Sequence, residues 1–389
     1  MKTIYFDNAA TTKVDESVLK AIEPYFTEKY GNASSLHYIG EESRRAIEEV
    51  RNTIAKSIGA KYNEIIFTGS GTEANNFVIK GLFWSHRDPL RGKNYPEKNH
   101  IITTKIEHDC VLNACKWLET QGAKVTYLDV DNEGFVDLGE LKKEITDKTI
   151  LFSVIHGNNE VGTIQNLEEI GKICREKNIL LHTDACQSFT KVPINVRKMN
   201  VNLMTLNAHK IHGPKGVGAL YIREGIKIVP LLHGGGQEFK LRSSTENVPG
   251  IIGFEKAVKI ASSSNVKKME QLRDKLIRGI LEIPNTKLNG ARGNRRLCNN
   301  INVSFNNIEG EAIGSFLNAK GISSSTGSAC SSKSLDPSHV LLALGKSPLE
   351  ANSSIRLSIS KYTTEEEVDY VLQELKKIVE KLRKISPIK

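Results

Sequence analysis

The hydrophobic positions in the first two thirds of the chain fall into short runs that alternate with longer amphipathic stretches. Short apolar runs bounded by turn residues are typical of buried strands, and the stretches between them have the period of helices. The runs are "EIIFTGSG", "HIITTKIEH", "KVTYLDV", "TILFSVIHG", "ILLHTDA", "LMTLNAH" and "GALYIREG". This alternation predicts βα units that build a mainly parallel sheet, with a helix beginning at Thr72 after the first run.

The pattern changes near residue 260. A long helical stretch with a serine-rich interruption, "GFEKAVKIASSSNVKKMEQLRDKLIRGILE", leads to strands at "NNINVSF" and "SIRLSIS" and to a helix from about Thr364. The Thr-Thr-Glu-Glu start of that helix is typical of a helix N-terminus. We therefore expect an N-terminal segment (1–15) that packs with a small domain, a large domain (16–260) and a small α/β domain (261–389). The stretch 87–100, "RDPLRGKNYPEKNH", predicts a surface loop.

Composition narrows the class of protein. The chain has 389 residues, of which 39% are hydrophobic and 25% charged, as expected of a soluble globular protein with a large core. The net charge of +9 is spread along the chain, which favours solvated lysine-rich helix faces over a nucleic-acid groove. A basic surface could still attract an acidic partner protein or tRNA.

The cysteines and the N-terminus indicate the compartment. Six cysteines without a CxxC pair argue against a zinc ribbon or a disulfide framework and favour a reducing cytosol. The start "MKTIYFDNAATT" lacks the pattern of a signal or transit peptide, and no apolar run approaches the roughly 20 residues of a membrane span. We therefore expect a cytoplasmic protein.

Polar residues follow most of the predicted strands. In open α/β sheets the ligand binds beyond the carboxyl ends of the strands, so these residues are candidates for a site. They are Gly71, Thr72, His108, Asn159, Asp184, Gln187, His209 and Lys210.

Three of these features suggest a particular cofactor. Lysine forms Schiff bases with carbonyl compounds, and pyridoxal phosphate uses this chemistry, which makes Lys210 a candidate. A lysine that stands alone is more often an exposed loop residue, but two further features accompany Lys210. Asp184 suits the pyridine nitrogen of that cofactor, but an Asp after a strand is as often a helix cap. The loop "GSGTEANN" precedes a helix whose N-terminus favours a phosphate, although many such loops are only turns. It is not a Walker motif, because no GK[ST] follows.

The sequence as a whole resembles a known family. It is similar to the cysteine desulfurases of the NifS and IscS type, in the class V branch of the fold-type I pyridoxal-phosphate enzymes. The resemblance covers essentially the whole chain and implies a large, mainly parallel seven-stranded sheet domain, a smaller α/β C-terminal domain and a homodimer. It rests on "YFDNAATT", "YGNASSLH", "FTGSGTEANN", "EHDCV", "GNNEVGTIQ", "HTDACQS", "AHKIHGPKGVGALYIR", "GGGQE", "RSSTENVPG", "NVSF", "STGSACSS" and "IRLSIS".

The resemblance implies roles around the cofactor ring. Lys210 would bind pyridoxal phosphate covalently and move protons at the substrate Cα. Asp184 would pair with the pyridine nitrogen, while Gln187 and Asn159 would serve the phenolic oxygen. His108 would stack on the ring and exchange protons, although a buried structural histidine is the alternative.

The resemblance also implies the phosphate and substrate contacts. Gly71, Thr72, Asn207 and His209 would hold the phosphate, joined by Thr245 from the partner subunit. Arg356 would bind the substrate carboxylate, assisted by Asn32 and Asn159, although composition alone favours a surface charge at Arg356. The family commonly has Ser at position 207 and Gly at position 244, so Asn207 and Ser244 put the affinity for the cofactor in question.

The stretch "SSSTGSACSSKS" (323–334) has the composition of a linker but contains Cys330. The resemblance implies that Cys330 lies on a mobile loop (about 321–334), attacks the substrate sulfur and carries it away as a persulfide. We expect no resident metal, although Cys330 could transiently ligate an iron–sulfur cluster. The remaining cysteines are predicted to be packed small hydrophobes, namely Cys110, Cys115, Cys174, Cys186 and Cys298.

These inferences predict a pyridoxal-phosphate-dependent cysteine desulfurase that converts L-cysteine to L-alanine and an enzyme persulfide. The implied sulfur acceptors are an iron–sulfur scaffold first and tRNA thiolation second. The alternatives are a selenocysteine lyase or another class V enzyme, such as a small-amino-acid transaminase, and a non-catalytic sulfur-carrier scaffold or RNA-binding protein. A transaminase has no use for a cysteine in a serine-rich loop, and an intact set of catalytic residues argues against the scaffold.

Overall fold

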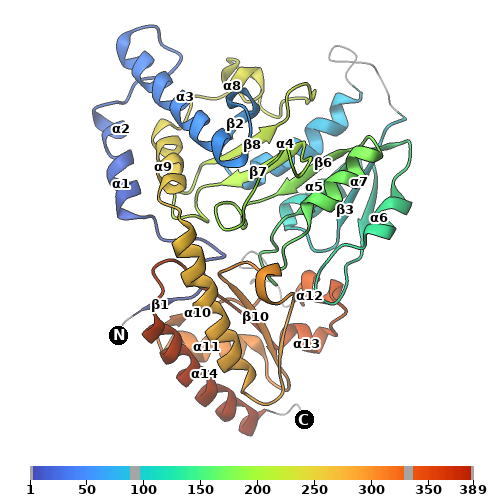
Figure 1. The fold of residues 1–389 in the computed structure, drawn as a ribbon, viewed down its shortest axis with the longest axis vertical. Coiled ribbons are helices and arrows are strands. Elements are labelled where there is room, and N and C mark those ends of the chain that lie inside the picture. The colour runs from blue at the N-terminus through green and yellow to red at the C-terminus, as the bar shows by residue number, and fades with distance from the viewer. Residues whose placement is uncertain (1–2, 88–96, 328–335, 387–389) are drawn as a thin grey trace.

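The computed structural model describes residues 3–87, 97–327 and 336–386. Figure 1 shows a larger part built around one sheet and a smaller part that contains β1, β10, α10, α11 and α14. Most of the surface loop expected at 87–100 lies outside the described residues, and so does Cys330. No described helix is long and apolar enough to cross a membrane.

The sheet of the larger part has seven strands in the order β2-β8-β7-β6-β5-β3-β4. β8 runs antiparallel to β2 and β7, and the other neighbours are parallel, so the predicted mainly parallel seven-stranded sheet is confirmed. The strands are β2 (Ile65–Thr68), β3 (His100–Thr104), β4 (Lys124–Leu128), β5 (Thr149–Ile155), β6 (Leu180–Asp184), β7 (Leu203–Asn207) and β8 (Gly218–Ile222). Those with continuous apolar runs are buried on both faces, because helices pack on each side.

Helices on the two faces of this sheet form two separate apolar clusters. Ile54 of α3 (Tyr38–Ile58) and Phe254 of α9 (Val248–Lys259) belong to one cluster, and Phe77 of α4 (Gly71–Ser85) belongs to the other. The remaining helices of this part are α1 (Glu16–Ile22), α2 (Pro24–Thr27), η1 (Tyr62–Glu64), α5 (Asp109–Glu119), α6 (Leu138–Glu144), α7 (Leu167–Glu176) and α8 (Gln237–Lys240).

The smaller part contains an antiparallel sheet in the order β12-β10-β9, and a separate parallel pair joins β1 to β11. The β1–β11 pairing brings the chain start to this part, where Phe6 is fully buried in its core. The elements are β1 (Ile4–Tyr5), β9 (Thr286–Leu288), β10 (Asn300–Phe305), β11 (Ile322–Ser323), β12 (Ser354–Ser358), α10 (Ser263–Leu281), η2 (Gly293–Arg295), α11 (Gly310–Ala319), α12 (His339–Ala343), α13 (Pro348–Asn352) and α14 (Glu365–Ile385).

The first residues of α14 and α4 are set by the side chains that cap these helices. α14 begins after Thr364, which forms a capping box with Glu367, as the sequence predicts. α4 begins at Gly71, one residue before the predicted start, because the Ser70 side chain accepts a hydrogen bond from the Glu73 N–H and caps the helix. The N-terminus of α4 therefore lies directly at the carboxyl end of β2, where a ligand of the sheet would bind.

Candidate active site

A cavity of about 230 Å³ lies beyond the carboxyl ends of the central strands. Because the ends of parallel strands meet at one edge of a sheet, residues far apart in the sequence line it together. Its lining includes Gly71, Thr72, His108, Asn159, Asp184, Gln187, Asn207, His209, Lys210 and Arg356. Most of the residues singled out in the sequence are thus brought to one place, while their individual roles stay predictions.

Asp184 is the last residue of β6, and its carboxylate is buried and held on both oxygens. Oδ2 accepts a hydrogen bond of 2.7 Å from the Asn75 side-chain amide, and Oδ1 accepts one of 2.9 Å from the Cys186 N–H. These contacts fix the orientation of the carboxylate and leave lone pairs for a further donor such as a ring N–H. Asn75 was not singled out from the sequence, although it lies within the motif "GTEANN".

His108 caps the N-terminus of α5. Its Nδ1 accepts a hydrogen bond of 3.2 Å from the Cys110 N–H and lies 3.1 Å from the Cys110 Sγ. An accepting Nδ1 places the proton of the neutral ring on Nε2, which gives the cavity a proton donor.

Cys110 packs against the apolar cluster that contains Phe77, as predicted, but it also reaches the cavity. It is partly exposed and lines the cavity beside His108, because it lies in the first turn of α5 at the cavity edge. The other four described cysteines are buried, and burial raises the pKa of Cys115 and Cys174 to about 12 and that of Cys298 to about 11. Such thiols stay protonated at neutral pH and are poor nucleophiles.

The amine of Lys210 contacts the N-terminal segment. Nζ donates to the carbonyl oxygens of Ala9 at 2.5 Å and Ala10 at 2.6 Å. The Gln187 side-chain amide donates to the same Ala9 oxygen at 2.8 Å. The segment before α1 therefore forms one wall of the cavity through its backbone, which sequence reasoning could not identify from side-chain chemistry.

The N-terminus of α4 approaches the cavity closely. A Cβ at Gly71 would lie 2.7 Å from the Cys186 Sγ, so any other residue would force that buried side chain to move. Free N–H groups at a helix N-terminus favour a phosphate. Asn207, at the end of β7, has a buried Oδ1 without a hydrogen-bond partner among the described residues. This oxygen is an acceptor, so it is available to a donor group of a ligand rather than to a phosphate oxygen.

His209 lies next to Asn207 and completes this side of the cavity. Its Nδ1 is 3.1 Å from the Thr11 hydroxyl. Burial, together with the positive charges of Lys210, Lys215 and Lys191, lowers the pKa of His209 to about 3. The ring is therefore neutral at physiological pH and can act as a hydrogen-bond donor without adding charge.

Arg356 reaches the cavity from β12 of the smaller part. Nη2 donates to Asp7 Oδ1 at 2.9 Å and Nη1 donates to the Asn159 carbonyl at 3.1 Å. Its Nε is buried and has no partner among the described residues. A buried guanidinium with an unused N–H suits a planar anion such as a carboxylate.

Two predicted residues lie outside this cavity. Thr245 lines a separate cavity of about 130 Å³ with Arg242 and Ser244. Asn32 is exposed, and its Oδ1 accepts a hydrogen bond of 2.9 Å from Ser34 N–H. A single chain does not bring either residue to the cavity. In the described part of the chain, no cluster of three or more His, Cys, Asp or Glu side chains could hold a metal ion.

The residues that line the cavity fit pyridoxal phosphate. A lysine amine, an oriented carboxylate and a helix N-terminus approached through Gly71 match its aldehyde, ring nitrogen and phosphate. The kinds of chemical groups that line the cavity, rather than its shape alone, support the fit of pyridoxal phosphate.

The chain matches known proteins along nearly its full length. Residues 4–371 match the family model described as aminotransferase class-V. "Cysteine desulfurase IscS" of Methanosarcina thermophila is 51% identical over 390 residues, covering 100% of this chain and 94% of that protein. "Cysteine desulfurase IscS" of Dictyoglomus turgidum is 50% identical, covering 100% of this chain and 97% of that protein. Among solved structures, a "NifS-like protein" has a TM-score of 0.90 at 41% identity, covering 98% of this chain and 100% of that one.

Proposed function

Because the chain belongs to the aminotransferase class-V family and is a cysteine desulfurase that depends on pyridoxal phosphate, we propose that Lys210 and Cys330 divide its chemistry between them. Lys210 would act on the carbon side of L-cysteine, and Cys330 would accept the sulfur. The observation that carries this proposal is the single cavity that joins Lys210, Asp184, His108 and Arg356.

Pyridoxal phosphate, when bound, withdraws electrons from the Cα of the amino acid and so makes the neighbouring bonds labile. Asp184 would hold the proton on the ring nitrogen, because its oriented carboxylate has lone pairs left for that N–H. Lys210 would bind the cofactor covalently and then carry a proton to and from Cα. Its amine lies at the cavity wall formed by Ala9 and Ala10, within reach of a ligand there.

Arg356 would bind the carboxylate of L-cysteine, since its Nε has no other partner in the described part of the chain. Its two remaining contacts, to Asp7 and to the Asn159 carbonyl, hold the guanidinium in place before substrate arrives. His108 would donate or accept a proton near the substrate sulfur through Nε2, because Nδ1 is engaged by the Cys110 N–H.

Cys330 would attack the substrate sulfur as a thiolate. A sulfur–sulfur bond forms, the carbon–sulfur bond breaks, and its electron pair returns to the carbon fragment, which takes up a proton to become L-alanine. An ordinary thiol is only a few per cent ionised at neutral pH, so a base such as His108 would assist. Cys330 lies outside the described residues, and its role rests on the family resemblance.

A second copy of the chain would complete the phosphate site. Thr245 lies in a different cavity of its own subunit, so its proposed phosphate contact requires a homodimer. We further propose an iron–sulfur scaffold as the sulfur acceptor, with tRNA thiolation as the second candidate; the net charge of +9 suits an acidic partner. The division at residue 260 and the cytoplasmic location stay predictions.

The first experiment follows both products of the purified protein. The protein should be yellow, and L-cysteine should change that colour while alanine and sulfur are released in equal amounts. Lys210→Ala should abolish the colour and the alanine together. A colourless protein unable to take up the cofactor, or a protein that releases no alanine, would overturn the proposal. Competition with L-selenocysteine distinguishes the enzyme from a selenocysteine lyase.

A further inference from the structure

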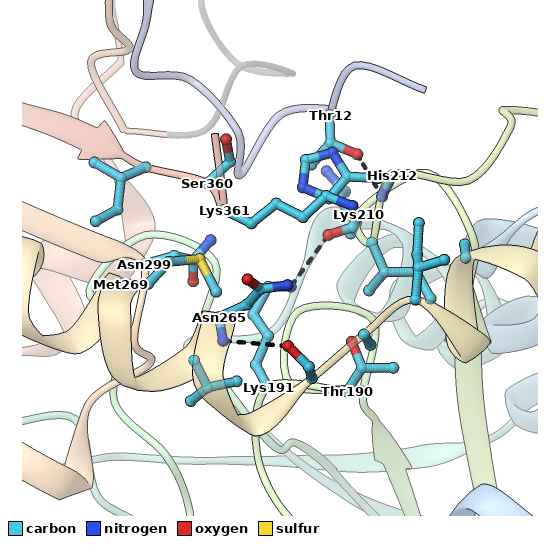
Figure 2. Close-up of a pocket in the computed structure, with 17 residues that line it drawn as sticks. Thr12, Thr190, Lys191, Lys210, His212, Asn265, Met269, Asn299, Ser360 and Lys361 are labelled. Carbon is cyan, nitrogen blue, oxygen red and sulfur yellow. Dashed lines mark hydrogen bonds between the residues drawn. The ribbon is translucent and has the colours of Figure 1, made fainter. Parts of the chain in front are cut away.

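Lys191 contacts the backbone of two residues of the candidate active site. Its Nζ donates to the Gln187 carbonyl at 2.9 Å and to the Lys210 carbonyl at 3.2 Å. Figure 2 shows the Lys191 side chain reaching toward Lys210, with a dashed line for the hydrogen bond from the Lys191 Nζ to the Lys210 carbonyl. One ammonium therefore connects the loop after β6 to the loop after β7.

The turn that carries Lys191 is strained. Thr190 has a φ of +63°, a conformation that β-branched residues rarely adopt. The preceding Phe189 is buried and packs edge-to-face on Phe254 at 6.1 Å between ring centroids, which anchors the turn. Local strain of this kind persists only where the surrounding structure fixes it, and it is concentrated at functional sites.

The ammonium of Lys191 lacks a carboxylate partner in the described part of the chain, whereas the neighbouring Lys361 is paired with Asp15. Lys191 lines a small cavity with Asn299, whose buried Oδ1 also has no partner among the residues described (Figure 2). Burial lowers the pKa of Lys191 to about 8. A partly buried cation without a counter-ion is unfavourable for stability. The hydrogen bonds of Lys191 to the Gln187 and Lys210 carbonyls are therefore better explained by a role in the site than by a contribution to stability.

We propose that Lys191 is a positioning residue that fixes the backbone of Lys210 and places a positive charge beside that backbone. Held at its carbonyl, Lys210 keeps its side chain directed to the Ala9 and Ala10 oxygens. A nearby positive charge disfavours the protonated form of an amine, so Lys191 also keeps the Lys210 amine nucleophilic at lower pH. This inference rests on the proposed role of Lys210 in binding the cofactor.

The test measures how fast the apoprotein captures pyridoxal phosphate, followed by visible absorbance from pH 6.5 to 9.5. Lys191→Met removes the ammonium but keeps a long side chain, and Lys191→Arg keeps the charge. Lys215→Met is the matched control, because Lys215 is exposed and also lowers the pKa of His209 but does not contact the Lys210 backbone. All variants keep the other ionisable and charged groups of the cavity, namely His108, Cys110, Asp184, Cys186, His209 and Arg356.

Lys191→Met should raise the pH of half-maximal capture by about 0.5 to 1 unit, which slows capture at pH 7.5 by about threefold to tenfold. Lys191→Arg should restore the wild-type capture rates below about pH 8, where Lys191 itself is charged, and Lys215→Met should leave the whole profile unchanged. If Lys191→Met folds poorly, Lys191→Gln replaces it in the same assay.

A Lys191→Met protein with the wild-type capture profile but a lower melting temperature would overturn the inference and leave Lys191 as a support for the turn. Failure of the wild-type apoprotein to capture the cofactor, or capture that survives Lys210→Ala, would instead overturn the proposed function. The two failures are therefore distinguishable.

Discussion

The side-chain amide of Asn75 donates a 2.7 Å hydrogen bond to the Asp184 carboxylate, across 109 residues of sequence. Asn75 lies on α4, whose N-terminus faces the cavity, and Asp184 ends β6. The contact links the proposed phosphate site to the proposed partner of the cofactor ring. Through this contact α4 orients the Asp184 carboxylate, and its N-terminus also provides the N–H groups of the proposed phosphate site.

Asn75→Ala should lower kcat/KM for L-cysteine by about 10- to 100-fold, because a hydrogen bond to a charged group contributes about 1.5 to 3 kcal/mol. Steady-state alanine production measures the effect. Asn76→Ala is the control, since the Asn76 amide donates to the Thr72 and Cys110 carbonyl oxygens and does not contact Asp184. Equal activities of the two variants would contradict the role given to Asn75.

Arg356→Lys should raise KM for L-cysteine by about 10- to 100-fold with a smaller change in kcat, because an ammonium cannot bind a carboxylate through two parallel N–H groups. Initial rates over a range of cysteine concentrations separate the two constants. Arg295→Lys, at an exposed surface pair with Glu133, should leave both constants unchanged. An unaltered KM in Arg356→Lys would remove Arg356 from substrate binding.

Arg51→Met should destabilise the protein by about 3 to 5 kcal/mol, because it leaves Glu238 as an uncompensated buried charge. Both side chains are 3% exposed, and the guanidinium makes two hydrogen bonds of 2.7 and 2.9 Å to the carboxylate. Urea unfolding of the apoprotein at fixed concentration gives the free energy of unfolding. The exposed pair Lys61–Glu224 provides the control, since Lys61→Met should cost about 1 kcal/mol or less. If Arg51→Met and Lys61→Met lowered the free energy of unfolding by similar amounts, the stabilising role of the buried Arg51–Glu238 pair would be contradicted.

Acid should weaken the fold through His182, which is buried in the sheet between the hydroxyls of Ser153 and Thr205. Burial lowers its pKa to about 4, below the ordinary value of about 6.5. Between these values the unfolded chain binds a proton that the folded protein excludes. The free energy of unfolding therefore falls as pH falls from about 6.5 to 4, by at most about 1.4 kcal/mol per pH unit for this histidine.

Urea unfolding between pH 7 and 4.5 measures that slope. His182→Asn should make the decline with falling pH shallower by about one proton, whereas replacement of the exposed His233 by Asn should not change it. An unchanged slope in His182→Asn would show that other groups bind the protons.

The buried strands and the place of the cavity could be predicted from the sequence. Apolar runs marked the strands, the Thr364 capping box marked the start of α14, and the polar residues after successive strands met at one edge because the strands are parallel. His108, Asp184 and Lys210 came together in this way. These signals are local, so a single sequence contains them.

Contacts that depend on distant segments could not be predicted. The Ala9 and Ala10 oxygens that accept hydrogen bonds from the Lys210 Nζ are backbone atoms about 200 residues away. Any residue type could supply such oxygens, so the sequence does not mark them. The exposure of Cys110 depends on where α5 begins relative to the cavity, and motif spacing does not give that. The hydrogen bonds of Lys191 to the Gln187 and Lys210 carbonyls depend on a positive φ at Thr190. Glycine is the usual sequence signal for a positive φ, and this position has a threonine instead.

The most direct test of sulfur transfer follows the cysteine peptides of the enzyme by mass spectrometry after one turnover with L-cysteine. The wild-type protein should carry one additional sulfur atom on the Cys330 peptide. Cys330→Ser should retain the cofactor absorbance but lose sulfide production, whereas Cys298→Ser, at a buried thiol, should retain both. Undiminished sulfide output from Cys330→Ser, or additional sulfur on another cysteine of the wild-type enzyme, would contradict the account.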